Sequence, residues 1–270
     1  MNLFNTKLIE HFNSKQVVKV ITGINSSNIF HILKLAKAAE LSNATYLDVA
    51  ANTKVIKILK SFSNVPICVS SINPLDLYNC VLAGADLIEI GNFDIFYKQG
   101  IYLSPSQVID LVKEIRLLIE DVDICVTIPY YLNLFEQVKL AQNLQDLDIN
   151  ILQTESLAVT NKLNLPLIDN MFNSINLSSL SLLSTYIIAS SVQIPVISSS
   201  KINNLSTPIA KYYGASGIGI GSALSDKDNI YDMTCYINEI HKSLVLNNNL
   251  NDFHNNVFIP NFLYYSDLMS

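Results

Sequence analysis

Short runs rich in Val and Ile alternate along the chain with longer amphipathic segments. The apolar runs are nearly continuous, as is typical of parallel strands that are covered on both faces. They lie at residues 17–24 (VVKVITGI), 45–51 (TYLDVAA), 65–72 (VPICVSSI), 86–93 (DLIEIGNF), 123–129 (DICVTIP), 150–156 (NILQTES), 194–200 (IPVISSS) and 217–223 (GIGIGSA). The segments between them have helical spacing, so the pattern predicts strands that alternate with helices.

Capping residues support these helix boundaries. Asn25 or Ser26 precedes the segment NIFHILKLAKAAEL, and Asn73 and Ser104, each followed by proline, precede two further helices. Such side chains accept hydrogen bonds from the first amides of a helix, and proline is favoured at the first helical position. The regular strand spacing, without a glycine-rich first turn, favours a (β/α)8 TIM barrel over an open doubly wound sheet.

The barrel is expected to be one domain over residues 17–245. Residues 1–16 predict a short amphipathic helix, with Leu3, Phe4, Leu8, Ile9 and Phe12 on one side. Residues 246–270 form an Asn-rich and then aromatic tail, which is expected to pack on the barrel or on a partner.

Two stretches share one frame, GADLIEIGN at 84–92 and GASGIGIGS at 214–222. Each enters a strand, the fourth and the eighth, so the two copies should lie half a barrel apart. Gly84 and Gly214 are suited to the left-handed conformation that ends a helix. An internal half-barrel repeat explains the match, and convergent turn chemistry is the alternative.

Charge and cysteine usage exclude several classes of function. The net charge is −6 with no basic stripe, so nucleic acid binding is not expected. The four cysteines form no CxxC pair and the four histidines have no metal-ligand spacing, so we expect reduced thiols and no metal site, and the sequence identifies no cofactor. The uncharged stretch between Asp169 and Lys201 is Ser-rich and is cut by Pro195, which favours a buried helix and strand over a membrane span.

Three carboxylates lie in or at the end of predicted core strands: Asp48, Glu89 and Glu155. Strands 2, 4 and 6 contribute to one layer of a barrel, so these residues are candidates for acid/base catalysis at one mouth. The alternative is a structural ion pair, for instance with Lys19. A Schiff-base mechanism is disfavoured because Lys19 lies early in strand 1.

The loops after strands 7 and 8 carry anion-binding chemistry. Ser199, Ser200 and Lys201 offer hydroxyls and an ammonium group, while Gly221 and Ser222 offer backbone N–H groups. Both loops resemble those of phosphate-binding TIM barrels, such as epimerases and thiazole synthases, which implies phosphate binding here. The Ser-Gly-Gly usual after strand 7 in those barrels is absent. A tight turn is the structural alternative for Gly221 and Ser222.

Long runs across residues 17–245, including ATYLDVAAN, PICVSSINP and LAGADLIEIGNFDIFYKQGI, resemble the uncharacterised plastid reading-frame family designated ycf, number twenty-three, of algal chloroplasts and cyanobacteria. The resemblance implies a chloroplast-encoded stromal protein, and it transfers no catalytic residues.

Two functions therefore remain open. One is an enzyme acting on a small phosphorylated metabolite, most plausibly an isomerase, epimerase or lyase that uses Glu89 and Asp48. The other is a barrel that binds a ligand or a protein without catalysis, and that could form a homo-oligomer. The aromatic stretch 94–103, with Gly100 as a hinge, suits a lid over the ligand or a contact with another subunit.

Overall fold

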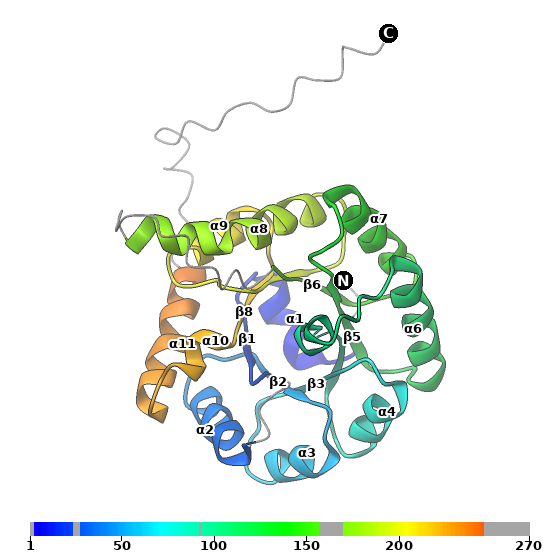
Figure 1. The fold of residues 1–270 in the computed structure, drawn as a ribbon. Coiled ribbons are helices and arrows are strands. Elements are labelled where there is room, and N and C mark those ends of the chain that lie inside the picture. The colour runs from blue at the N-terminus through cyan, green and yellow to red at the C-terminus, as the bar shows by residue number, and fades with distance from the viewer. Residues whose placement is uncertain (1–2, 24–27, 92, 157–169, 246–270) are drawn as a thin grey trace.

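Eight parallel strands close into a barrel in sequence order, which confirms the predicted TIM barrel (Figure 1). The computed structural model describes residues 3–23, 28–91, 93–156 and 170–245. The predicted tail, 246–270, lies outside the described residues. The strands are β1 (Val17–Ile21), β2 (Tyr46–Ala50), β3 (Ile67–Ser71), β4 (Leu87–Ile90), β5 (Asp123–Ile128), β6 (Ile151–Thr154), β7 (Val196–Ser198) and β8 (Gly217–Ile220).

Helix α1 (Thr6–Asn13) precedes β1, and the other helices follow the strands. These are α2 (Ile29–Glu40), α3 (Thr53–Lys60), α4 (Pro74–Leu82), α5 (Asp94–Lys98), α6 (Pro105–Leu118), α7 (Leu134–Gln145), α8 (Asn170–Ala189), α9 (Thr207–Tyr212), α10 (Ser222–Ser225) and α11 (Ile230–Val245). Every strand is shorter than its apolar run. The apolar runs therefore overestimate the strand lengths by one to four residues, because they include residues beyond the hydrogen-bonded ladder.

The capping predictions hold at two of three helices. Asn73 caps α4, and Ser104 forms a capping box with Gln107 at α6. At α2 the prediction is wrong, because the cap is Asn28, whose side chain accepts hydrogen bonds from the amides of Phe30 and His31. A run of Asn and Ser residues offers several chemically equivalent caps, and the backbone geometry selects among them.

The repeated frame has the same backbone role in both copies. Gly84 follows α4 with φ +108°, and Gly214 follows α9 with φ +99°. Each glycine leads into a strand, β4 or β8, and these strands lie four positions apart in the closed sheet. The left-handed conformation explains why glycine begins both copies.

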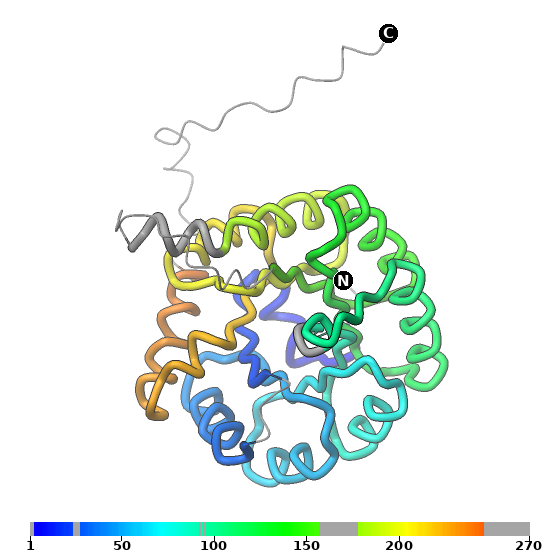
Figure 2. The backbone as a smooth tube through the Cα atoms, viewed as in Figure 1, coloured from blue at the N-terminus to red at the C-terminus, as the bar shows by residue number. Residues whose placement is uncertain are grey.

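Helix α1 closes the N-terminal end of the barrel. Leu8 and Phe12 are 1% and 2% exposed, and they pack against inward side chains such as Tyr46 and Leu87. In Figure 2 this blue helix lies behind the barrel axis. The Asp123 carboxylate accepts hydrogen bonds from the amides of Phe4 and Asn5, each at 2.9 Å. The predicted apolar side is only partly buried, since Phe4 remains 50% exposed.

The uncharged stretch forms α8 and β7, as predicted. Its hydroxyls bond within the structure: Thr154 of β6 meets Ser181 and Thr185 of α8, and Thr185 donates to Ser198 of β7. Among the described residues, no helix is long and apolar enough to cross a membrane. Cys68, Cys80 and Cys125 are buried free thiols.

Candidate functional site

A charged cluster occupies the barrel interior, on the mouth side of the apolar cluster that Leu8 and Phe12 of α1 form with Tyr46 and Leu87. Lys19 of β1, Asp48 of β2 and Glu89 of β4 have side chains that are 2% exposed or less. Side chains alternate along a strand, so Val18 and Val20 pack among the helices while Lys19 points inward. One cation and two carboxylates therefore meet inside the barrel.

The Lys19 ammonium group is fully hydrogen-bonded. It contacts Asp48 Oδ2 at 3.1 Å and Gln153 Oε1 at 2.8 Å, and it also donates to Glu89 Oε2. An ammonium group has three donors, and each has an acceptor here. Burial alone would lower the pKa of Lys19, but Asp48 and Glu89 outweigh burial and raise the pKa well above its usual value. Lys19 is therefore held as a cation.

Glu89 is the more heavily bonded carboxylate. Its Oε1 accepts from Thr127 at 2.9 Å and from Gln153 Nε2 at 3.0 Å, in addition to the Lys19 bond at Oε2. Gly91 lies directly above it: a Cβ at Gly91 would fall 2.5 Å from both Glu89 Oε1 and Thr127 Oγ1. The glycine is required there because the chain leaving β4 passes over the carboxylate.

Asp48 has more acceptor capacity left. Among the described residues it accepts from Ser70 at 2.5 Å and from Lys19, although an ionised carboxylate offers about four acceptor sites. Its pKa is raised to about 6, chiefly by burial and also by Glu89, while Lys19 opposes the shift. A carboxyl that titrates near neutral pH can both accept and return a proton.

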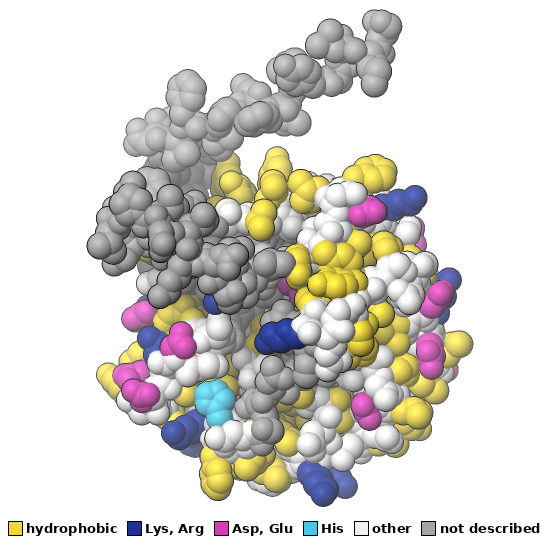
Figure 3. Space-filling view, in the orientation of Figure 1, with side chains coloured by type: hydrophobic (Ala, Val, Ile, Leu, Met, Phe, Trp, Pro, Cys, Tyr) yellow, Lys and Arg dark blue, Asp and Glu magenta, His cyan; other side chains and the backbone are white. Residues whose placement is uncertain are grey.

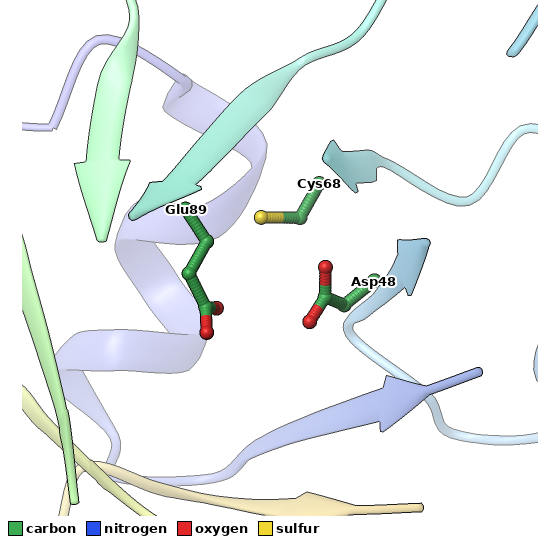
Figure 4. Close-up of side chains that lie close together, drawn as sticks. All are labelled: Asp48, Cys68 and Glu89. Carbon is green, nitrogen blue, oxygen red and sulfur yellow. The ribbon is translucent and has the colours of Figure 1, made fainter. Parts of the chain in front are cut away.

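A metal would have to compete with Lys19. Figure 4 shows Asp48, Cys68 and Glu89 converging from neighbouring strands, with ligand atoms within 4.8 Å of one another. The Lys19 ammonium already bridges both carboxylates. Burial and then Asp48 raise the pKa of Cys68, which disfavours the thiolate that a metal requires. These donors suit the ammonium group better than a divalent ion.

Glu155 does not join this cluster, so the prediction that three carboxylates share one layer is wrong in that respect. The β6 residue that reaches Lys19 is Gln153. Glu155 lies two residues further along, about 6.6 Å nearer the mouth at the usual rise of a strand. It accepts hydrogen bonds from the Tyr97 hydroxyl of α5 and from the Tyr130 amide at 3.2 Å.

The five predicted phosphate residues lie at the same mouth. Ser199 is buried and donates to the Thr154 carbonyl at 2.8 Å. Ser200 and Lys201 both adopt positive φ, 69° and 61°, and Lys201 is exposed. Gly221 precedes α10, whose first residue is Ser222, and no side chain caps this helix.

The face of the barrel that carries the mouth is apolar on one side. In Figure 3 hydrophobic side chains gather near α7, whereas the visible charged side chains are scattered around the rim. Ile101, Tyr102, Leu134 and Phe135 are exposed, by 43%, 51%, 41% and 76%. The described Lys side chains visible on this face form no continuous basic patch.

Comparison with known proteins agrees with the barrel. Residues 3–250 match the family described as "Protein of unknown function (DUF561)". The "Uncharacterized protein ycf23" of Antithamnion sp. is 50% identical over 246 residues, 89% of this chain and 88% of that protein. The protein of the same description from Cyanophora paradoxa is 43% identical, over 87% of this chain and 96% of its own length.

Solved structures share the fold at low identity. (S)-3-O-geranylgeranylglyceryl phosphate synthase from Thermoplasma acidophilum, in complex with sn-glycerol-1-phosphate, is 13% identical with a TM-score of 0.60, covering 90% of this chain and 98% of its own. Thiamine phosphate pyrophosphorylase from Pyrococcus furiosus is 15% identical with a TM-score of 0.56, over 86% and 97%. The family match over residues 3–250 shows that the chain belongs to the DUF561 family, and the algal relatives from Antithamnion sp. and Cyanophora paradoxa are both described as ycf23.

Proposed function

We propose that the protein binds a small phosphorylated metabolite at the barrel mouth and transfers a proton on it, as an isomerase, epimerase or lyase. The observation that carries this proposal is the Lys19–Asp48–Glu89 cluster inside the barrel. Asp48 has unused acceptor capacity and a pKa raised to about 6, as a proton-transfer group needs at neutral pH. Lys19 supplies a fixed positive charge that would stabilise an oxyanion developing on the substrate.

Glu89 has a different part in this proposal. Its bonds to Lys19, Thr127 and Gln153 hold the ammonium group in place. We therefore assign Glu89 to positioning Lys19 and Asp48 to proton transfer. Exchanging Glu89 for glutamine should lower turnover by misplacing Lys19, whereas Asp48→Asn should abolish it.

The loops after β7 and β8 are proposed to hold the phosphate. The first turn of α10 has no capping side chain, and Lys201 adds an exposed ammonium group. A structural neighbour of the same fold was solved with sn-glycerol-1-phosphate, which supports a phosphorylated ligand. We further propose a plastid-encoded stromal protein, because the relatives come from algae and share the ycf name.

Thermal-shift screening against phosphorylated metabolites tests the ligand class. A ligand at 100 times its Kd should stabilise the protein by about 2.7 kcal/mol. Gly221→Asp should abolish this shift, and Gly221→Ala is the matched control. Both variants place a Cβ 3.1 Å from the Ile21 carbonyl oxygen, so they differ by the carboxylate group alone. Equal loss in both variants, or no shift with any phosphorylated compound, would reject the phosphate proposal.

A non-catalytic binding barrel is the second candidate. The observation that favours it is the complete pairing of Lys19 together with the near-total burial of Asp48 and Glu89. Incorporation of deuterium from the solvent into the ligand distinguishes an enzyme from a non-catalytic binding protein. An enzyme that transfers a proton should incorporate deuterium into its bound ligand in D2O, and Asp48→Asn should stop the incorporation; a binding protein should incorporate none.

A further inference from the structure

The chain between β4 and α6 covers the barrel axis at the mouth. This mouth segment, Phe93–Leu103, includes the five-residue helix α5, which lies in front of the axis in Figures 1 and 2. Its approach from β4 passes through Gly91, directly over the Glu89 carboxylate. Because the Lys19, Asp48 and Glu89 side chains are 2% exposed or less, a ligand at the mouth cannot contact them in this conformation.

Two hydrogen bonds join the mouth segment to neighbouring strand ends. The Tyr97 hydroxyl donates to Glu155, just past the end of β6, and Glu155 also accepts from the Tyr130 amide. The Tyr131 hydroxyl, just past β5, donates to the Leu103 carbonyl. Of the two, the Tyr97 bond ends on a carboxylate and is therefore the stronger.

Ring packing accompanies these bonds. Tyr97 stacks on Tyr102 at a centroid distance of 5.3 Å and meets the edges of Tyr130 at 5.0 Å and Tyr131 at 5.5 Å. Helix α5 is far too short to be stable alone, so these contacts maintain it. At the far end, Gly100 has φ +73°, and a Cβ there would meet no atom within 4 Å. The positive φ at Gly100 favours glycine at this turn.

We infer that the mouth segment is a lid and that the Tyr97–Glu155 hydrogen bond is its latch. The inference rests on the proposed function in one respect only, that the site beneath the lid is the one a ligand uses. In this proposal Glu155 controls the access of a ligand to the site. It does not transfer a proton, although the sequence makes it a candidate for acid/base catalysis. A ligand reaches Asp48 after Tyr97 releases Glu155.

Hydrogen–deuterium exchange on the full-length, ligand-free protein tests the latch. Tyr97→Phe removes the hydroxyl and keeps the ring. The amides of Tyr97, Gln99 and Ile101, which bond within the segment, should exchange about tenfold faster or more, as expected for the loss of one hydrogen bond to a charged group. Amides of β1–β3 should be unchanged.

Tyr102→Phe is the matched control, because among the described residues the Tyr102 hydroxyl forms no hydrogen bond while its ring packs on Tyr97. It should leave the exchange as in the wild type. Glu155→Gln keeps an acceptor without the charge and should give an intermediate rate. Wild-type exchange in Tyr97→Phe, or faster exchange spread over the whole barrel, would overturn the latch. Since no ligand is used, failure of the phosphate proposal would not alter this result.

Discussion

The two copies of the repeated frame share a backbone and differ in what they place inside the barrel. β4 carries Glu89, whereas the matching position on β8 is Gly219, which pairs in register with Lys19 of β1. A Cβ at Gly219 would fall 2.8 Å from Ser199 Cβ. At this position β8 has no room for a side chain. On β4 the same position carries Glu89, whose carboxylate bonds to Lys19 on β1, the strand beside β8.

This comparison shows that a repeated backbone need not repeat its chemistry. In both copies glycine ends a helix with positive φ, a requirement of the turn alone. The interior position, which is the third residue of each strand, depends on neighbouring side chains. At Gly219 the side chains of Ser199 and Ile21 leave no room for a Cβ, whereas at Glu89 the Lys19 ammonium group supplies the opposite charge.

The largest loss of stability should come from removing the Lys19 ammonium group, which bonds to Glu89 of β4 and lies beside Gly219 of β8. Lys19→Met leaves Asp48 and Glu89 facing each other in a buried site, which should lower the free energy of unfolding by about 3–5 kcal/mol. Urea denaturation measures this loss. Adding Asp48→Asn and Glu89→Gln to Lys19→Met should recover part of it, and an equal loss in the triple variant would show that packing, not charge, dominates.

Titration of Asp48 should have a smaller effect: it should change the free energy of unfolding by at most about 1.4 kcal/mol per pH unit. The folded-state pKa of Asp48, about 6, lies above that of an unfolded aspartate, so the folded state binds the proton more tightly. The stabilisation from the protonated Asp48 carboxyl group is therefore present at low pH and is lost as the pH rises from about 4 to about 6. Denaturation of wild type and Asp48→Asn across this range isolates it. A constant difference between the two proteins would contradict the raised pKa.

The smallest expected effect is the difference in stability between alanine variants of the two helix-ending glycines. Gly84→Ala and Gly214→Ala each force alanine into the left-handed conformation, at a cost of about 1–2 kcal/mol. Gly214→Ala should cost more, because its Cβ would fall 2.9 Å from Ala189 Cβ, whereas that of Gly84 would lie 3.6 Å from the flexible Lys60 side chain. Melting temperatures of the two variants test the order, which equal values would refute.

The sequence by itself determined the barrel. Alternating apolar strands and capped helices specify it locally, since each strand's apolar run and each helix's cap act over a few residues. The sequence also identified Asp48 and Glu89, because a carboxylate inside an apolar strand is visible without coordinates. A lysine inside the first strand carries the same signal, and Lys19 reaches both carboxylates despite its early place in that strand.

Only the tertiary structure decided which charges meet. Lys19 reaches Asp48, Glu89 and Gln153 because barrel closure sets β1 beside β2 and β8 and staggers the strands. The sequence predicts Glu155 at the same mouth as Asp48 and Glu89, but Glu155 lies two residues beyond Gln153 and bonds to Tyr97, while Gln153 reaches Lys19. Such a stagger depends on the pairing of all eight strands at once, and no local pattern of residues records it.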